Sequence, residues 1–418
     1  MQVMRIGIDY TAAVCQGAGI GRYTRELVRA VLAHDLHSEY RLFAAAGGEK
    51  SSFRPPLSLP GLTGHDSRER GPLAAAQAGR VKVRLLPLSD RRMAMIWHEL
   101  RLPIPVELFT GRVDVFHSPD FTLPPVFQAR TLLTIHDLSF LTHPETVHSH
   151  VRRYLQAAVP RSVARADHVL AVSEHTRRDL MSWLGVPAER VSVVYHGVDQ
   201  RFYRVTEPDH LAAVRARYAL PRRFILHVGT LQPRKNLVRL IEAYAALIGE
   251  GGASGGQRRL ADEPPALVLA GGKGWLCGDI FEAVRRLRLE GQVHFPGFVD
   301  EADLPALYSL AELFVYPSLY EGFGLPVLEA MACGTPVVCS NAASLPEVAG
   351  EAALLVPPGD AGRLVAAMRF ALTDTGVRAR LVAAGLTQAR RFTWEEAARR
   401  TVEVYRWLAG VEKRSHEA

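Results

Sequence analysis

The stretch Leu313-Phe-Val-Tyr-Pro-Ser-Leu-Tyr-Glu-Gly-Phe-Gly-Leu-Pro-Val-Leu-Glu329 contains a short apolar run, a glycine turn and the start of an apolar helix. The apolar residues at 313–316 are typical of a strand that is buried on both faces of a parallel sheet. Pro326 suits the first position of a helix, because an N–H at that place would have no partner within the helix. The stretch therefore predicts a strand, a turn and a helix, which is the repeating unit of α/β folds.

Similar apolar runs recur along the chain, each followed by a helical pattern. They lie at 5–9, 81–86, 113–118, 131–136 and 168–173 in the first half, and at 224–229, 267–271, 293–295, 313–316, 336–339 and 353–356 in the second. The series runs twice in a chain of 418 residues, which is longer than the ~250–300 residues at which single cores stop growing. We therefore predict an α/β fold of two doubly wound, Rossmann-like domains that face each other across a ligand cleft.

The polar stretch before the strand at Phe224 separates the two series. We predict an N-terminal Rossmann-like domain at 1–200, a C-terminal Rossmann-like domain at 201–390, and a C-terminal segment at 391–418 that crosses back to the first domain. Its helix covers 394–407, with Thr393 as the N-cap. We expect loops at 44–80 and 249–265, where Gly, Ser, Pro and charged residues gather.

The composition is that of a packed globular protein. Hydrophobic residues make up 48% of the chain and charged residues 22%, with a formal net charge of +7. The basic excess is larger in 1–200, which fits either an anionic partner or an arginine-rich composition. No nucleic-acid-binding motif accompanies the charge, so we expect no nucleic acid partner.

The cysteines and the N-terminus bear on the compartment. The four cysteines form no C-x-x-C pair, so they predict neither a zinc site nor a disulfide framework. The chain opens on a strand rather than a signal peptide, and it has no apolar run of the ~20 residues that span a bilayer. We expect a cytoplasmic protein, with peripheral contact at the inner face of the membrane left open. The stretch at 90–98 is either an interfacial helix for a lipid-linked acceptor or a segment packed in the core.

The glycine turn of the opening stretch predicts an anion site. Its backbone N–H groups, at Gly322, Phe323, Gly324 and Leu325, lead into a helix N-terminus. Glu321 precedes the helix, and we expect Glu329 in its first turn. Carboxylates do not bind phosphate, so we expect both to accept hydrogen bonds from hydroxyls, one set on a sugar and one on a ribose. The alternative makes Glu321 a helix-dipole partner and Glu329 a surface residue.

A second motif, Gly229-Thr-Leu-Gln-Pro-Arg-Lys-Asn236, follows directly after a strand. Arg234 can bind phosphate oxygens through two N–H groups, and Lys235 adds a point charge. The pair suits a diphosphate. Solvated basic pairs are also common at turns, so this motif gains its weight from the glycine turn at 322–325.

Two features of the first half are weaker. Gly17-Ala-Gly-Ile-Gly21, followed by Arg22, does not have the glycine spacing of a dinucleotide fingerprint. We expect Gly19, Gly21 and Arg22 to approach a donor phosphate or sugar, although a plain turn is nearly as good a reading. His136 ends a strand, where we expect the chemistry of the acceptor side. The alternative interpretation is a core histidine whose hydrogen bonds are satisfied within the protein.

Metal motifs are missing from the sequence. His143, His148 and His150 match no zinc spacing, and we expect them to be loop residues. There is no D-x-D, so we predict a site that uses neither a metal ion nor any other cofactor.

Together these motifs resemble the family-4 retaining glycosyltransferases, which have the GT-B fold. The resemblance covers nearly the whole chain and includes 17–21, 134–137, 171–174, 196–199, 228–236 and the E-x7-E motif from Glu321 to Glu329. Of these, only the E-x7-E motif is specific by itself. Within the family, the chain looks like the bacterial mannosyltransferase B-like branch, which often works on polysaccharides or lipid-linked glycans from GDP-mannose.

The resemblance implies that 1–200 is the acceptor-side domain and 201–390 the nucleotide-sugar-binding domain, and it implies a role for each matched residue. Arg234 and Lys235 would hold the diphosphate, and Glu321 would meet the transferred sugar. Glu329 would bind the ribose, and His136 would face the sugar from the other domain. The backbone near Phe298 and Val299 would read the base.

The sequence departs from the family at one cation. Many relatives carry arginine where this chain has Thr230, and Arg22 is a candidate to replace that charge. The resemblance implies metal-independent transfer of a hexosyl group, such as mannose from GDP-mannose, to a glycan or lipid-linked acceptor with retention. Two alternatives stay open at this point: a GT-B sugar-nucleotide epimerase and a non-catalytic nucleotide-binding protein. The oligomeric state is not predicted.

Overall fold

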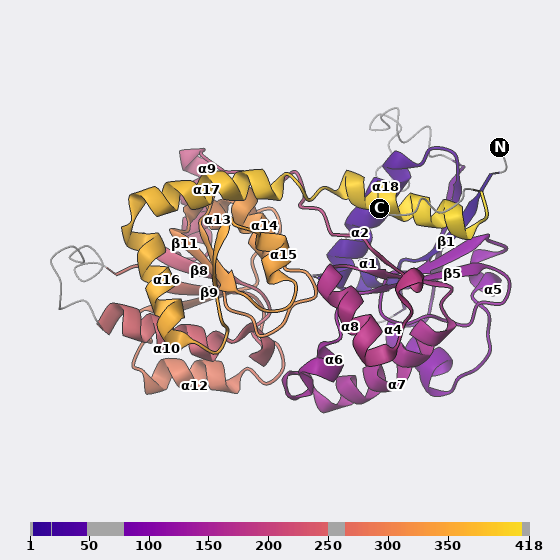
Figure 1. Cartoon of the computed structure of the whole chain (residues 1–418), viewed down its shortest axis with the longest axis horizontal. Coiled ribbons are helices and arrows are strands. Elements are labelled where there is room, and N and C mark those ends of the chain that lie inside the picture. Colours follow the sequence, from indigo (N-terminus) through magenta and orange to yellow (C-terminus); the bar gives the residue numbers. More distant parts are fainter. Residues whose placement is uncertain (1–2, 18, 48–78, 250–263, 412–418) are drawn as a thin grey trace. The chain divides into compact units, whose positions relative to one another are not determined.

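The computed structural model describes residues 3–17, 19–47, 79–249 and 264–411. They form two compact units (Figure 1). Unit 1 consists of Met1–Leu138, Arg153–Gly197 and Thr393–Ala418, and unit 2 of Ser139–Arg152 and Val198–Phe392. The division lies close to the predicted one at residues 200 and 390. It differs by placing Ser139–Arg152 with unit 2.

Unit 1 contains a seven-stranded sheet in which all neighbouring strands are parallel. Its strands are β1 (Arg5–Asp9), β2 (Glu39–Ala45), β3 (Val81–Leu86), β4 (Val115–Ser118), β5 (Arg130–Ile135), β6 (His168–Ala171) and β7 (Val191–Val193). They are arranged in the order β3-β2-β1-β4-β5-β6-β7. The chain therefore leaves β1 toward one edge of the sheet and returns to the other side of β1 at β4.

Helices join and cover these strands. They are α1 (Thr11–Cys15), α2 (Ile20–His34), α4 (Asp90–Ala94), the π-helical η1 (Met95–Glu99), α5 (Glu107–Thr110), α7 (Ser149–Arg165), α8 (Glu174–Leu184), the 3-10 turn η3 (Ala188–Arg190) and α18 (Trp394–Leu408).

The C-terminal helix α18 belongs to the core of unit 1. It begins after Thr393, whose hydroxyl accepts a hydrogen bond from the N–H of Glu396 at 3.2 Å, as the sequence predicted. It packs alongside α2 (Figure 1), and Tyr405 is fully buried among the apolar residues of that core. The Tyr405 hydroxyl is hydrogen-bonded to His117 of β4 at 2.7 Å. The last helix is thereby tied to the middle of the first sheet.

Unit 2 contains a six-stranded sheet, again parallel throughout. Its strands are β8 (Phe224–Val228), β9 (Ala266–Ala270), β10 (Val293–Gly297), β11 (Leu313–Tyr316), β12 (Val337–Ser340) and β13 (Ala353–Val356), in the order β10-β9-β8-β11-β12-β13. The remaining elements are α6 (Ser139–Thr142), η2 (Pro144–Thr146), α9 (Pro208–Arg217), η4 (Pro233–Lys235), α10 (Leu237–Gly249), α12 (Gly278–Arg286), α13 (Leu304–Leu310), α14 (Leu325–Ala332), α15 (Leu345–Ala349), α16 (Ala361–Thr373) and α17 (Thr375–Ala389). Buried residues of β8, β9 and β11 form one core with α10 and α16.

The two doubly wound, Rossmann-like units confirm the predicted fold class. Every apolar run of the sequence overlaps a strand, but two strands were not predicted. The strand β2 was missed because its charged and apolar residues alternate, and its end was wrongly assigned to the loop at 44–80. The short strand β7 is only three residues long and was not predicted as a strand.

Two predicted loops lie largely outside the described residues. Residues 48–78 of the first and 250–263 of the second are not described. The second loop was predicted from residue 249, where the structure still has α10. In the described part of the chain, no helix is both long enough and apolar enough to cross a membrane.

Candidate active site

The motifs after β8 and β11 meet at one point of the sheet in unit 2. The strand β8 pairs with β9 on one side and with β11 on the other, so the connections leaving β8 and β11 run in opposite directions. The carboxyl ends of strands at such a switch point are where doubly wound sheets bind ligands. The amide of Asn236 donates to the Pro317 carbonyl at 3.1 Å, and the Leu319 N–H donates to the Arg234 carbonyl at 2.9 Å. These bonds hold the two turns together.

Arg234, Lys235 and Glu321 form an ion cluster at this switch point. Arg234 Nη1 donates to Glu321 Oε2 at 2.8 Å, and Lys235 Nζ donates to Glu321 Oε1 at 2.6 Å. Glu321 is only 6% exposed and Lys235 only 7%. Burial by itself raises the pKa of Glu321, but the charges of Arg234 and Lys235 outweigh it and lower the pKa to about 2. Glu321 is therefore ionised at neutral pH, and the cluster carries one net positive charge.

Two aromatic side chains lie near Lys235, and neither was predicted from the sequence: Tyr316 contacts the lysine, and His227 stacks on Tyr316. Lys235 Nζ donates to the Tyr316 hydroxyl at 2.5 Å and lies 4.8 Å from the centre of the Tyr316 ring. The His227 ring stacks on Tyr316 with 5.3 Å between centroids. Burial, with a smaller effect from Lys235, lowers the pKa of His227 to about 3, so His227 is neutral and does not repel the lysine. Tyr316 and His227 lie near the ends of two predicted strands, which is the signal that could have singled them out.

The glycine turn leads into α14 as predicted. Gly324 precedes the helix with φ +113°, a conformation that favours glycine. The Ser344 hydroxyl is placed to donate to the carbonyls of Glu321 and Phe323, at 2.8 and 2.7 Å. These contacts hold the backbone of the glycine turn around Gly322 beside the ion cluster. Leu325, rather than Pro326, is the first helical residue.

Glu329 lies one turn deeper in the helix than we predicted. It is in the second turn of α14, because that helix begins at Leu325. It is 3% exposed, and its Oε2 accepts a hydrogen bond from the Tyr308 hydroxyl at 2.8 Å. The alternative reading of Glu329 as a surface residue is therefore wrong. Its bond to a ribose stays a prediction.

The predicted base-reading residues follow β10. Phe298 is 56% exposed and Val299 only 5%. An exposed aromatic ring beside a strand end can pack on a flat base, but the part that the backbone of these two residues plays stays a prediction.

The predicted site residues of unit 1 surround the start of α2. Gly19 caps this helix and Gly21 lies in its first turn. A side chain at Gly21 would bring its Cβ to 2.0 Å from the Gln16 carbonyl oxygen, so the close packing requires glycine. Arg22 is half-buried in the same turn. The contact of these residues with a donor stays a prediction.

His136 has a partner within unit 1. It is 8% exposed, and its Nε2 lies 2.8 Å from the Pro119 carbonyl oxygen, so that Nε2 carries the proton and donates. Burial lowers the pKa of His136 to about 4. The imidazole is therefore neutral at pH 7, with Nδ1 unprotonated. Its predicted approach to the donor sugar is not tested by this geometry.

The histidines at 143, 148 and 150 were predicted to be loop residues. His143 lies between α6 and η2, with its ring 5.2 Å from that of Tyr320. His148 precedes α7, whereas His150 is part of that helix, which corrects the prediction for this residue. Across the described ranges, no three His, Cys, Asp or Glu side chains are grouped so that they could hold a metal ion.

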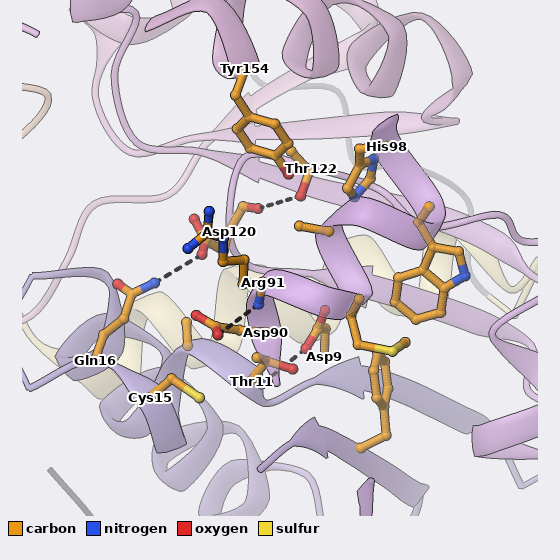
Figure 2. Close-up of a pocket in the computed structure, with 15 residues that line it drawn as sticks. Asp9, Thr11, Cys15, Gln16, Asp90, Arg91, His98, Asp120, Thr122 and Tyr154 are labelled. Atoms are coloured by element: carbon orange, nitrogen blue, oxygen red, sulfur yellow. Dashed lines mark hydrogen bonds between the residues drawn. The ribbon is translucent and has the colours of Figure 1, made fainter. Parts of the chain in front are cut away.

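A cavity of about 230 Å³ lies in unit 1 and was not predicted from the sequence (Figure 2). Asp9 from the end of β1 and Asp120 from the turn after β4 line it, together with residues of α1, α4, η1 and α7. Both carboxylates follow predicted strands, so their position could have drawn attention. The stretch at 90–98 forms α4 and most of η1; Met93 and Trp97 are buried, whereas Met95 is 42% exposed. One face of the stretch therefore packs in unit 1, and its contact with a membrane surface stays a prediction.

Sequence comparison assigns the two halves of the chain to glycosyltransferases. Residues 17–202 match the family described as Glycosyltransferase Family 4, and residues 215–388 match the family described as Glycosyl transferases group 1. The fold and the site thus define a glycosyltransferase with the GT-B fold. This result disfavours the epimerase and the non-catalytic alternatives.

Curated relatives support the same assignment. The chain is 33% identical to O-antigen chain mannosyltransferase B of Escherichia coli over 395 residues, which are 93% of this chain and 96% of that protein. It is 31% identical to D-inositol 3-phosphate glycosyltransferase of Streptomyces bingchenggensis over 250 residues, which are 58% of this chain and 53% of that protein. The chain belongs to glycosyltransferase family 4.

Solved structures show the same fold. A sucrose-phosphate synthase from Thermosynechococcus elongatus superimposes with a TM-score of 0.70 at 23% identity, covering 98% of this chain and 100% of that one. Anabaena HepE, crystallised with UDP and glucose, gives a TM-score of 0.67 at 19% identity, covering 96% of this chain and 99% of that one.

Proposed function

We propose that this glycosyltransferase moves a mannosyl group from GDP-mannose to a glycan or lipid-linked acceptor, with retention and without a metal ion. The main evidence for the donor site is the cluster of Arg234, Lys235 and Glu321 at the β8/β11 switch point. The similarity to O-antigen chain mannosyltransferase B over 93% of the chain supports mannose as the sugar. UDP in the crystal of HepE supports a nucleoside diphosphate as the leaving group.

The cluster can stabilise a departing diphosphate. Two cations and one carboxylate leave a net positive charge beside the N-terminus of α14, where the helix dipole also attracts anions. The cluster is buried, so its charges are weakly screened. Charge that develops on the leaving oxygen would meet groups that are already oriented, which lowers the barrier without reorganisation.

Glu321 has a more specific role in this proposal than the sequence predicted. Its two oxygens accept from Arg234 and Lys235 and hold both cations in place. In this proposal the carboxylate also accepts a hydrogen bond from a hydroxyl of the donor sugar. Glu321 therefore orients the cations and contacts the donor sugar, and it does not act as an acid with a pKa of about 2.

The reaction we propose exchanges one C1–O bond for another on the same face of the sugar. The bond between C1 and the diphosphate oxygen breaks, and the acceptor hydroxyl oxygen bonds to C1. The acceptor proton passes to the departing diphosphate. Glu329 and Tyr308 lie buried beside this site, where Glu329 would bind the ribose.

The test is a donor screen followed by product analysis. GDP-, UDP- and ADP-linked sugars are compared by thermal shift, since a ligand that binds only the folded protein raises its apparent stability. The best donor is then supplied, with its sugar labelled, together with α-linked mannobiose. Acceptor-dependent release of nucleoside diphosphate and an α-linked product support the proposal. Label in a free epimerised sugar nucleotide, or a β-linked product, would contradict it.

A further inference from the structure

The ammonium group of Lys235 is held by contacts at the far end of a long side chain. Its Nζ donates to Glu321 Oε1 at 2.6 Å and to the Tyr316 hydroxyl at 2.5 Å. The stem of the lysine passes Gly229, where an added Cβ would lie 3.5 Å from Lys235 Cε. Glycine offers no side chain that could confine this flexible stem. The direction in which the ammonium group points therefore depends on Glu321 and Tyr316.

Tyr316 gives the lysine an anchor of a different kind from Glu321. The Glu321 carboxylate is shared with Arg234, and its negative charge offsets part of the positive charge of the cluster. Tyr316 is fully buried at the end of β11. Burial, with a smaller effect from the charge of Glu321, raises the pKa of Tyr316 well above its ordinary value of 10. The hydroxyl is therefore neutral at pH 7, and it accepts from the ammonium group without cancelling its charge.

His227 fixes the ring that carries this hydroxyl. The strands β8 and β11 pair as far as Leu226 and Phe314. At the next residue, the Nδ1–H of His227 donates to the Val315 carbonyl at 3.1 Å, so a side-chain bond continues the link between the two strands. The imidazole lies against the Tyr316 ring, with an angle of 15° between the two planes. The position of the hydroxyl is thus set by the sheet itself.

We propose that Tyr316 is a positioning residue of the donor site, whose hydroxyl and ring hold the Lys235 ammonium group where charge develops on the departing diphosphate. His227 holds the ring in turn. The inference rests on the proposed function, which places the diphosphate at the ion cluster. Tyr316 acts through Lys235 and not by touching the donor. Because a small displacement of a group that stabilises the transition state lowers the rate, loss of this anchor should lower kcat.

The first variant is Tyr316→Phe, which removes the hydroxyl and keeps the ring. We expect kcat to fall about tenfold, as for the loss of one hydrogen bond to a charged group. The donor KM should stay within threefold of wild type. Tyr244→Phe is the matched control, because Tyr244 is equally buried and donates to the Pro265 carbonyl at 3.1 Å, just before β9 and at the opposite end of the sheet. Its kcat should stay at the wild-type value, and thermal unfolding shows whether each variant is folded.

A double-mutant cycle separates a positioning role from a merely structural one. It compares wild type, Tyr316→Phe, Lys235→Met and the double variant. If Tyr316 acts through Lys235, its hydroxyl has nothing left to position once the lysine is absent. We therefore expect Tyr316→Phe to change kcat less than twofold in the Lys235→Met background. An equal loss in both backgrounds would overturn the inference, as would a folded Tyr316→Phe protein with kcat within twofold of wild type.

His227→Leu is an independent second variant. It leaves the Tyr316 hydroxyl in place and removes the flat ring and the Nδ1–H donor that fix it. We expect a severalfold fall in kcat that again disappears in the Lys235→Met background. If Tyr316→Phe does not fold at the assay temperature, this second cycle decides: an unchanged kcat, or an equal loss in both backgrounds, would reject the inference.

Product binding distinguishes failure of this inference from failure of the proposed function. GDP and UDP carry the charge that develops on the leaving group, and calorimetry measures their Kd with the same four proteins. We expect Tyr316→Phe to raise the Kd only where Lys235 is present. Absence of turnover with every nucleotide sugar would reject the proposed function, whereas this binding pattern would still support Tyr316 as a positioning residue for a diphosphate. Failure of both nucleotides to bind, or an effect of Tyr316→Phe that is independent of Lys235, would reject the inference.

Discussion

Replacing Lys235 with methionine tests the ion cluster most directly. Methionine is close to lysine in length and can fill the space against Tyr316, but it carries no charge. In the native cluster, Lys235 and Arg234 face the single carboxylate of Glu321 at 2.6 and 2.8 Å. In the variant, Arg234 and Glu321 neutralise each other, so the net positive charge available to a diphosphate disappears.

The expected loss follows from that change in charge. Only the backbone N–H groups before α14 would remain to stabilise the departing diphosphate. We expect the turnover number to fall at least ~100-fold, equivalent to about 2.7 kcal/mol in the activation free energy. Breaking a buried ion pair by removing one partner typically costs ~3–5 kcal/mol of stability. Because Glu321 keeps Arg234 as its partner, we expect the loss of folding stability to be smaller than that.

The assay is release of nucleoside diphosphate from GDP-mannose at saturating donor and acceptor. Circular dichroism and thermal unfolding show whether the variant is folded at the assay temperature. Lys82→Met, at an exposed position of β3 in unit 1, is the matched control and should retain the wild-type rate. A folded Lys235→Met protein with turnover within threefold of wild type would refute the role of the cluster.

Four further results are expected. The folded-state pKa of Glu321 is about 2 and its ordinary value is 4.5, so its contribution to stability is complete above pH 4.5 and is lost as the pH falls toward 2. Urea titrations should therefore show a difference in the free energy of unfolding between wild type and Glu321→Gln, on the order of 3 kcal/mol, that shrinks between pH 4.5 and 2. A difference that stayed constant over this range would contradict the prediction. EDTA should leave the transfer rate unchanged, and a loss that is restored by a divalent cation would show that a metal takes part. Gly21→Ala should lower Tm measurably, because its Cβ would lie 2.0 Å from the Gln16 carbonyl oxygen, and an unchanged Tm would be inconsistent with this packing. Glu329→Gln should raise the KM for GDP-mannose more than tenfold while leaving acceptor KM unchanged; the opposite pattern would remove Glu329 from the donor site.

The strands of both sheets were readable because each is a local feature. Buried parallel strands need short runs of Val, Leu, Ile and Phe, and those runs stand out against the amphipathic helices between them. The two exceptions are β2, which begins with the alternating stretch Glu39-Tyr-Arg-Leu42 rather than a continuous apolar run, and β7, which is only three residues long. The cap at Thr393 was predictable for the same reason, since capping involves residues only three positions apart.

The E-x7-E motif shows where local reasoning stops. Its glycines and proline predicted a turn into a helix, and the structure has that turn at Gly324. The sequence could not show that both oxygens of Glu321 bind cations from a turn that precedes it by more than 80 residues. Nor could it show that Glu329 is buried against Tyr308, because the depth of a helical residue depends on what packs over it.

The sequence by itself determined the α/β class, the division into two domains, the cationic turn and the glycine turn, because these depend on residue type and short spacing. The tertiary structure alone decided which charges pair, which side chains support Lys235, and that Asp9 and Asp120 share a cavity. Those facts depend on the strand order, which brings distant strand ends together at the β8/β11 and β1/β4 switch points. Local patterns specify where a strand ends, and only the assembled sheet specifies which strand end lies beside it.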